Sequence, residues 1–164
     1  MERLTNAILG IIHPDLHQAG LAANVAYKDR TASCQPSNWT SAYSGMDVIV
    51  NQITPPHRDA SGTSSSYDLL ISLGKGYKAK LCVTDIGAKF AYHPGTLVFL
   101  CGKVLEHSVP AWDGGERVVI AHYMKDLLHD RMGFPCPNLP SQTFWCAPVH
   151  HHPVVHWLRH RQRG

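Results

Sequence analysis

The sequence has few of the features that mark exported, membrane-spanning or repetitive proteins. No stretch approaches the roughly 20 consecutive apolar residues that a transmembrane helix needs, and the N-terminus lacks a secretory signal pattern. The five cysteines are an odd number without a CxxC pair, which argues against a disulfide framework and for a reducing compartment. No repeat of solenoid spacing occurs. We therefore expect an intracellular protein with thiols that are free and no membrane segment.

What is present suits one compact domain. The chain has 164 residues, of which 44% are hydrophobic and 16% charged, enough apolar surface to bury a core. The net charge of +3 permits a polyanionic partner without requiring one. We expect a single domain over residues 1–149, followed by a basic, His-rich tail over residues 150–164.

Apolar spacing predicts two helices within residues 1–37, which would support the rest of the domain. The first helix covers residues 1–12, with an apolar face formed by Leu4, Ile8, Leu9 and Ile12. Pro14 interrupts it, and Asp15 is expected to cap a second helix that ends near Tyr27. The packing face of that second helix would consist of Leu16, Ala19, Ala22, Ala23 and Ala26.

From residue 39 onward the pattern changes to short strands separated by glycine-rich turns. Strands are expected at 46–53, 67–73, 77–86, 90–93, 96–101, 103–109 and 117–124. Such spacing favours a sandwich or barrel. The expected fold class is therefore mainly β with flanking helices (α+β): a jelly roll over residues 39–131, backed by the N-terminal helices. Residues 132–149 are proline-rich and are expected to wrap the surface as an extended segment.

A pair of candidate metal ligands follows the first of these strands. The strand is apolar and is expected to be buried; two prolines stop it, and His57 and Asp59 come next. Alternate residues of an extended segment point to the same side, so these two side chains face one space. A set of two imidazoles and one carboxylate suits non-haem Fe(II), and His107, on a later strand, is the candidate third ligand. Taken alone, a His and an Asp at this spacing are more often a surface hydrogen-bonded pair.

Arg117 is the candidate anion-binding residue. It follows His107 by ten residues, beyond an Asp-Gly-Gly turn, so its strand would pair beside that of His107. A guanidinium can bind a carboxylate through two parallel hydrogen bonds, which lysine does less well. The ordinary alternative for Arg117 alone is a salt bridge to Glu116 or Asp113.

With these residues the sequence resembles the Fe(II)/2-oxoglutarate dioxygenases, and more narrowly the TET/JBP group of nucleic-acid-modifying oxygenases, especially its fungal members. The resemblance covers roughly residues 39–131 and is carried by four segments, at 51–59, 92–96, 107–109 and 116–119. It implies a double-stranded β-helix fold, with Fe(II), 2-oxoglutarate and O2 as cofactors. His57, Asp59 and His107 would bind the iron, and Arg117 would hold the distal carboxylate of 2-oxoglutarate.

The resemblance also implies substrate contacts. Members of the group stack a flipped base on an aromatic residue six positions after the arginine, which here is Tyr123. Two positions further on, where a histidine often contacts the base, this chain has Lys125. The polar residue expected three positions after the metal-binding Asp is replaced by Gly62, and the nearest carboxylate, Asp68, is the candidate substrate contact. Packing in the core is an equally weighted interpretation of Tyr123.

The expected activity is oxidation of the methyl group of a methylated base in DNA. The candidate reactions are conversion of 5-methylcytosine to 5-hydroxymethylcytosine and beyond, and demethylation of N6-methyladenine, on a base flipped out of the duplex. The expected partner is therefore duplex DNA, with no membrane contact, a monomeric state and a nuclear location. Two alternatives stay open: a 2-oxoglutarate dioxygenase that hydroxylates a protein or small molecule, and a catalytically silent jelly-roll binding module.

The remaining histidines and cysteines give weaker signals. His93 and His122 are interpreted as structural residues rather than metal ligands. A zinc site is a further hypothesis, but its candidate ligands match no known finger spacing: Cys136, Cys146, His150 and His152. The basic tail could follow phosphates or simply be solvated.

Overall fold

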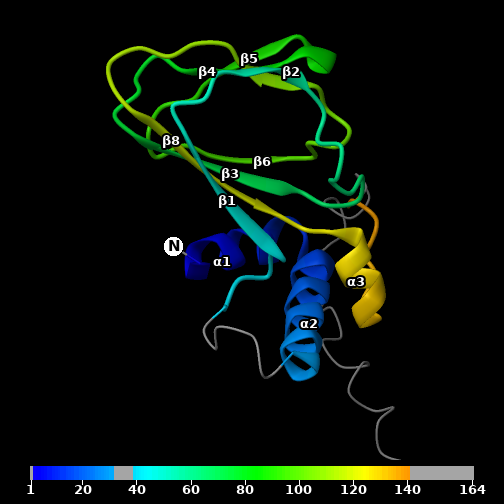
Figure 1. Cartoon of the computed structure of the whole chain (residues 1–164). Coiled ribbons are helices and arrows are strands. Elements are labelled where there is room, and N and C mark those ends of the chain that lie inside the picture. The colour runs from blue at the N-terminus through cyan, green and yellow to red at the C-terminus, as the bar shows by residue number, and fades with distance from the viewer. Residues whose placement is uncertain (1, 32–38, 141–164) are drawn as a thin grey trace, which may run out of the picture.

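The structure is a computed structural model that describes residues 2–31 and 39–140. Within these ranges the chain forms three α-helices, eight strands and one 3₁₀ turn (Figure 1). Among the described residues, no helix is long and apolar enough to cross a membrane. The elements are α1 (Glu2–Ile12), α2 (Pro14–Arg30), β1 (Gly45–Val50), β2 (Thr54–His57), β3 (Asp68–Gly74), β4 (Lys80–Val83), η1 (Thr84–Ile86), β5 (Ala88–Ala91), β6 (Leu97–Leu100), β7 (His107–Val109), β8 (Arg117–Tyr123) and α3 (Asp126–Met132).

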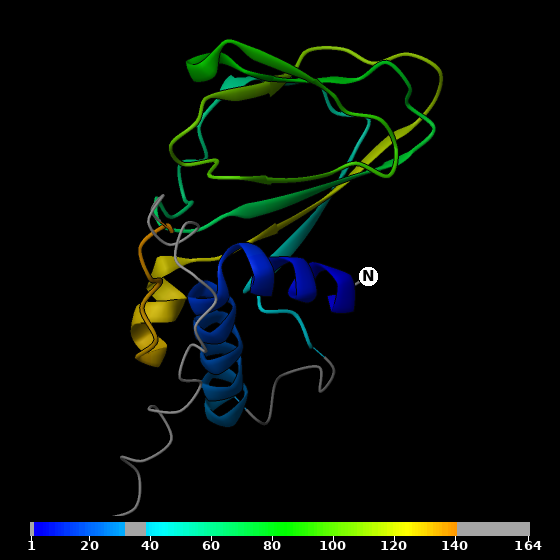
Figure 2. The ribbon, with the colours of Figure 1, turned by 180° about the vertical axis from the view of Figure 1, so that it is seen from behind.

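The eight strands form two antiparallel four-stranded sheets that face each other (Figures 1 and 2). The first sheet has the order β1-β8-β3-β6 and the second the order β2-β7-β4-β5. Except between β4 and β5, each strand passes to the opposite sheet, which is the winding of a jelly roll. The predicted fold class, an α+β double-stranded β-helix, is therefore confirmed.

The helices cover the face of the first sheet that points away from the second sheet (Figures 1 and 2). A hydrophobic cluster joins them to the sheet and includes Leu9, Leu16, Leu69, Ile71 and Met124. A second cluster fills part of the space between the sheets and includes Leu81, Val83, Tyr92, Val109 and Val119. The first sheet is thus packed on both faces, and the jelly roll has the helical backing expected from the sequence.

The first helix buries only part of the face that its apolar residues predict. Leu9 is fully buried and Ile12 packs against the same cluster, whereas Leu4 is 55% exposed. Thr5 is buried as well, which is tolerated because its hydroxyl donates to the carbonyl oxygen of Glu2 at 3.0 Å. The expectation that Leu4 lies on the buried face is wrong, since the sheet does not cover that end of the apolar stripe.

The second helix begins differently from the expectation. His13 is its N-cap: its Nδ1 accepts a hydrogen bond from the Leu16 N–H at 3.4 Å, and Pro14 occupies the first helical turn, where no N–H is needed. Asp15 is therefore not the cap. The helix continues to Arg30 rather than ending near Tyr27, and its buried residues are Leu16, Gly20, Ala23 and Asn24.

The prolines after β1 do not stop the strand as expected; they lie within β2. Both strands are at sheet edges, where missing N–H groups and irregular pairing are tolerated, and the β2–β7 register shifts between Thr54 and His57. The edge position also overturns the expectation that β1 is buried. Its outward side chains are largely exposed: Met46 (40%), Val48 (59%) and Val50 (53%).

Two further differences concern the C-terminal part of the described chain. Residues 126–132 form α3, a helix that the sequence analysis did not anticipate. Residues 133–140 are irregular. The rest of the expected wrap, residues 141–149, and the tail, residues 150–164, lie outside the described residues.

Replacing Gly20 by alanine should destabilise the fold. A Cβ at this position would collide with the carbonyl oxygen of Ala42 and lie 3.1 Å from its carbonyl carbon, because helix α2 approaches that segment closely. We expect a loss of about 1–3 kcal/mol in the free energy of unfolding, measured by urea titration. Gly10→Ala is the control: its Cβ would meet only the His17 ring at 3.5 Å, so the stability should be unchanged or higher.

Candidate metal centre

Two histidines face each other across the β2–β7 pair. His57 closes β2 and is paired with His107, the first residue of β7. The two ring centroids are 4.3 Å apart. Asp59 follows β2 and is held by its backbone N–H, which donates to the Gly102 carbonyl at 2.9 Å. The structure therefore brings together three residues that the sequence places on two distant segments.

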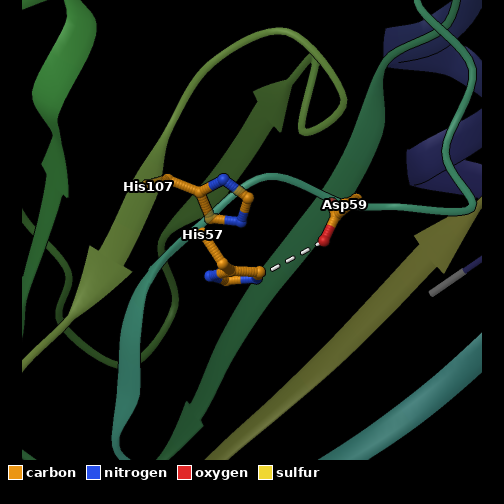
Figure 3. A group of neighbouring side chains, drawn as sticks. All are labelled: His57, Asp59 and His107. Atoms are coloured by element: carbon orange, nitrogen blue, oxygen red, sulfur yellow. Dashed lines mark ion pairs between the residues drawn. The ribbon is translucent and has the colours of Figure 1, made fainter.

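The three side chains converge on one point (Figure 3). Their ligand atoms all lie within 4.8 Å of one another, and His57 Nε2 is 3.4 Å from Asp59 Oδ1. Within residues 2–31 and 39–140 this is the one group of three His, Cys, Asp or Glu side chains with such geometry. His107 is buried, whereas His57 and Asp59 are partly exposed, so the site is open on one side.

Each imidazole is oriented by a backbone carbonyl two residues earlier. His57 Nδ1 lies 2.9 Å from the Pro55 carbonyl oxygen, and His107 Nδ1 lies 3.0 Å from the Leu105 carbonyl oxygen. Since a carbonyl oxygen only accepts hydrogen bonds, both Nδ1 atoms carry the proton. Both Nε2 atoms are then free to bind a metal. This is the usual way in which an outer contact fixes the tautomer of a metal-binding histidine.

The donor set suits a specific class of ion. Two imidazole nitrogens and one carboxylate oxygen, converging from one side, match the facial triad of non-haem Fe(II). The triad borders a cavity of about 310 Å³ that extends between the two sheets. Its apolar walls are formed by Ile49, Leu70, Leu81, Val109 and Val119.

Arg117 is a buried cation at this cavity. It is 3% exposed and lies between two aromatic rings, with its Cζ 5.4 Å from the Tyr92 centroid and 5.8 Å from that of Trp112. One terminal nitrogen donates to the Gln52 carbonyl at 3.1 Å, while Nε has no hydrogen-bond partner in the part of the chain that the structure describes. Burial lowers the pKa of the guanidinium.

No carboxylate in the described part of the chain forms an ion pair with Arg117. The salt-bridge alternative is not realised, because Asp113 pairs with Lys78 at 2.9 Å instead. A buried charge without a counter-ion is costly. The arrangement therefore suits binding of an anionic group that enters the cavity.

A second carboxyl lies beside the candidate ligand Asp59. Asp68, the first residue of β3, is 6% exposed and lines the cavity, and its Oδ1 has no hydrogen-bond partner among the described residues. Burial, and then the charge of Asp59, raises the pKa of Asp68 to about 7, opposed by a backbone hydrogen bond from Gly102. This orphaned polar atom faces a cavity, where a ligand can satisfy it.

Gly102 is a site residue that the sequence analysis missed. A Cβ there would collide with Asp59 Oδ2 and lie 3.0 Å from both Asp59 Cγ and Asp68 Oδ2. Only a residue without a side chain lets the two carboxyls share this wall. Its position after a strand resembles that of an ordinary turn glycine, so no local signal identified it.

The candidate substrate contacts also line the cavity. Gly62, Asp68 and Tyr123 all border it, together with Lys125, whose Nζ is 5.3 Å from the Tyr123 ring centroid. Tyr123 is half-buried and belongs to neither hydrophobic cluster, which speaks against the interpretation that it is core. The structure thus places every site residue named from the sequence around one space.

The other histidines and cysteines of the described part of the chain contribute no ligand to this centre. His122 is buried on the helix-covered face and pairs through Nε2 with Glu2 at 3.1 Å, and His93 is exposed. Cys136 is half-buried, and burial and Asp126 raise the pKa of its thiol to about 12. Cys146, His150 and His152, the rest of the hypothetical zinc set, lie outside the described residues.

Gly102→Ala should weaken metal binding without unfolding the protein. The φ angle of Gly102 is not positive, so alanine is allowed by the backbone, but its methyl group would push Asp59 out of the triad. We expect the affinity for Fe(II), or for Mn(II) as its redox-stable substitute, to fall about 10–100-fold in calorimetric titrations. Unaltered metal affinity in a folded Gly102→Ala variant would show that the position of Asp59 does not depend on a glycine at residue 102.

Two solved structures illustrate what the chain is similar to. NgTET1 in complex with 5mC DNA matches with 18% sequence identity over 60% of this chain and 41% of that chain, at a TM-score of 0.47. A Cupin 2 conserved barrel domain protein from Salinispora arenicola CNS-205 matches with 18% identity over 58% of this chain and 76% of that chain, at a TM-score of 0.37. The chain thus spans less than half of the NgTET1 chain. No curated protein matches significantly.

A comparison with protein families gives a more extensive match. The model of the Tet_JBP family, described as the oxygenase domain of the 2OGFeDO superfamily, matches residues 1–126. The match includes the three triad residues, Arg117 and Tyr123.

Proposed function

The chain belongs to the Tet/JBP family of oxygenase domains, within the 2-oxoglutarate- and Fe(II)-dependent dioxygenases, and we propose that it oxidises the methyl group of a methylated base in DNA. One observation carries the proposal. A single cavity holds a facial triad, a buried arginine that has no counter-ion within residues 2–31 and 39–140, and a tyrosine outside the hydrophobic core. These features correspond to the iron, the cosubstrate and a planar substrate.

The side chains fit the cofactors of this superfamily, which are Fe(II), 2-oxoglutarate and O2. His57, Asp59 and His107 would hold the iron, and Arg117 would hold the distal carboxylate of 2-oxoglutarate. When bound, these cofactors supply the oxidation: one oxygen atom of O2 enters the methyl group and the other enters succinate, as 2-oxoglutarate loses CO2.

Arg117 and its neighbours would orient the cosubstrate. The hydrogen bond to Gln52 and the contacts with the two aromatic rings fix the position of the guanidinium. Its remaining N–H groups can then form two parallel hydrogen bonds to one carboxylate. The apolar walls of the cavity keep water away from the oxidising centre. The protein thus contributes position and a dry environment.

A methyl group inside a duplex cannot reach a metal at the cavity wall, so the base must leave the stack. Extrusion of a base costs a few kcal/mol, and stacking on an aromatic side chain returns about 1–3 kcal/mol. Tyr123 is the residue available for stacking, because it borders the cavity beside Lys125. This supports a flipped base as the substrate.

Asp68 and Gly62 would contact the base that enters, and both are compatible with either modified base. The unpartnered Oδ1 of Asp68 can accept a hydrogen bond from an exocyclic amino group, which both 5-methylcytosine and N6-methyladenine carry. Gly62 borders the cavity without a side chain, which leaves room for a base of either size. Both modified bases are therefore proposed as substrates, and either one would satisfy the site.

The decisive experiment is mass spectrometry of nucleosides after incubation with Fe(II), 2-oxoglutarate and O2. The duplexes carry 5-methylcytosine, N6-methyladenine or no modification. We expect oxidised or demethylated bases that disappear when 2-oxoglutarate is omitted and in the variant His57→Ala/Asp59→Ala, because that variant lacks two of the three ligands. His93→Ala, which removes an exposed imidazole remote from the triad, should behave like the unchanged protein.

The other results of this experiment are equally informative. Consumption of 2-oxoglutarate without any change in the bases would reject methylated DNA and leave RNA, a protein or a small molecule as the substrate. Metal binding without any 2-oxoglutarate consumption would instead favour a silent binding module.

Arg117→Lys should weaken 2-oxoglutarate binding specifically. Lysine keeps the charge but loses the two-pronged contact with a carboxylate, and hydrogen bonds to charged groups contribute about 1.5–3 kcal/mol. We expect KM for 2-oxoglutarate to rise at least about tenfold, with KM for DNA and Mn(II) affinity unchanged. An unchanged KM for 2-oxoglutarate would remove Arg117 from the cosubstrate site.

A further inference from the structure

The tyrosine at the cavity rim lies across the neighbouring edge strand. Tyr123, the last residue of β8, is paired with Gly45, the first residue of β1. A Cβ on Gly45 would collide with Tyr123 Cε2 and lie 2.6 Å from Cζ and 2.8 Å from the hydroxyl oxygen. The ring therefore occupies the space that any other side chain at position 45 would need.

The backbone at this end of the sheet is tightly held. The Ser44 N–H and hydroxyl both donate to the Tyr123 carbonyl, at 3.0 and 3.2 Å, and the Lys125 N–H donates to the Ser44 hydroxyl at 3.0 Å. These bonds lock the register of β1 against β8. The position of the ring over Gly45 is thus a consequence of strand pairing rather than of loose surface packing.

Charged groups complete the surroundings of the ring. Asp47 lies on the same side of β1 as Gly45 and borders the cavity that Tyr123 also borders, so its negative charge acts on the Tyr123 hydroxyl. Desolvation, and then Asp47, raises the pKa of Tyr123. Lys125 Nζ lies 5.3 Å from the ring centroid, in cation–π geometry.

The φ angle of Gly45 shows that the backbone does not need glycine here. Positive φ angles occur at six glycines of the described chain, and Gly45 is not among them. Alanine is therefore conformationally allowed, and in a strand it would normally be the better residue. The physical reason for glycine at this position is the ring of Tyr123.

We propose that Gly45 and Asp47 are positioning residues that set the plane of the Tyr123 ring for base stacking. The inference rests on the proposed function, since it assigns these residues to the stacking of a flipped base. A stacking surface is effective only if its orientation is fixed before the base arrives, because a freely rotating ring must be ordered on binding. Strand β1, which carries none of the candidate metal ligands, would fix the orientation of the Tyr123 ring.

A double-mutant cycle tests the proposal. Gly45→Ala displaces the ring, so kcat/KM for the methylated duplex should fall about tenfold or more, as expected when base stacking is lost. Mn(II) affinity, KM for 2-oxoglutarate and thermal stability should not change. Because Gly45 acts through the ring, Gly45→Ala combined with Tyr123→Ala should be no worse than Tyr123→Ala alone.

Met46→Ala is the matched control. Met46 lies between the two positioning residues on β1, but its side chain is 40% exposed and points to the opposite face. Its removal should leave activity unchanged. A Gly45→Ala variant with the activity of the unchanged protein, or a double variant that loses more activity than Tyr123→Ala, would overturn the proposal.

A readout without substrate separates this inference from the proposed function. Ultraviolet absorbance follows the titration of the phenol, and Tyr123→Phe identifies the contribution of this residue. Asp47→Asn should lower the pKa of Tyr123, because the anion that raises it is gone, and Gly45→Ala should lower it too, because the ring leaves Asp47. If the intact protein oxidises no methylated base, the proposed function fails while this titration still tests the positioning. An unchanged titration in Gly45→Ala overturns the positioning itself.

Discussion

The pairing of β2 with β7 is the interaction on which the metal centre depends. It sets His57 opposite His107, and the carbonyl groups of Pro55 and Leu105 turn both Nε2 atoms toward the cavity. Asp59 is then anchored by the carbonyl of Gly102, which follows β6 of the other sheet. The three candidate ligands are thus held by both sheets of the jelly roll. A change in the distance between the sheets would therefore change the geometry of the triad.

Strand β8 spans the cavity and carries Arg117 at one end and Tyr123 at the other. Arg117 and Tyr123 are at its two ends and on the same face, because six residues is an even number along a strand. At about 3.3 Å per residue they are about 20 Å apart. A buried cation and an aromatic ring that both border the cavity are therefore held at a fixed separation, with the triad beside the space between them.

The sequence predicted the jelly roll, the helical backing and the residues around the cavity, and most of its errors share one physical cause. The prolines within β2 were taken as a strand end and β1 as buried, yet both strands are edges, where prolines and exposed apolar side chains are tolerated. Leu4 failed similarly, because the packing of α1 depends on neighbours outside the helix. Asp15 failed for a local reason, since the adjacent His13 caps the helix instead. Local periodicity identifies an element but not its place in a layer.

The sequence by itself determined which donors are available and on which side of a strand each one points. Period-two alternation places His57 with Asp59, and the resemblance carried by the segments around His57, His107 and Arg117 implied the family and its cofactors. Only the tertiary structure decided that Asp68 lies beside Asp59, that Arg117 has no counter-ion among the described residues and that Gly45 and Gly102 must lack side chains. Each of these facts depends on contacts between residues that are far apart in the chain. A local sequence pattern cannot predict such contacts.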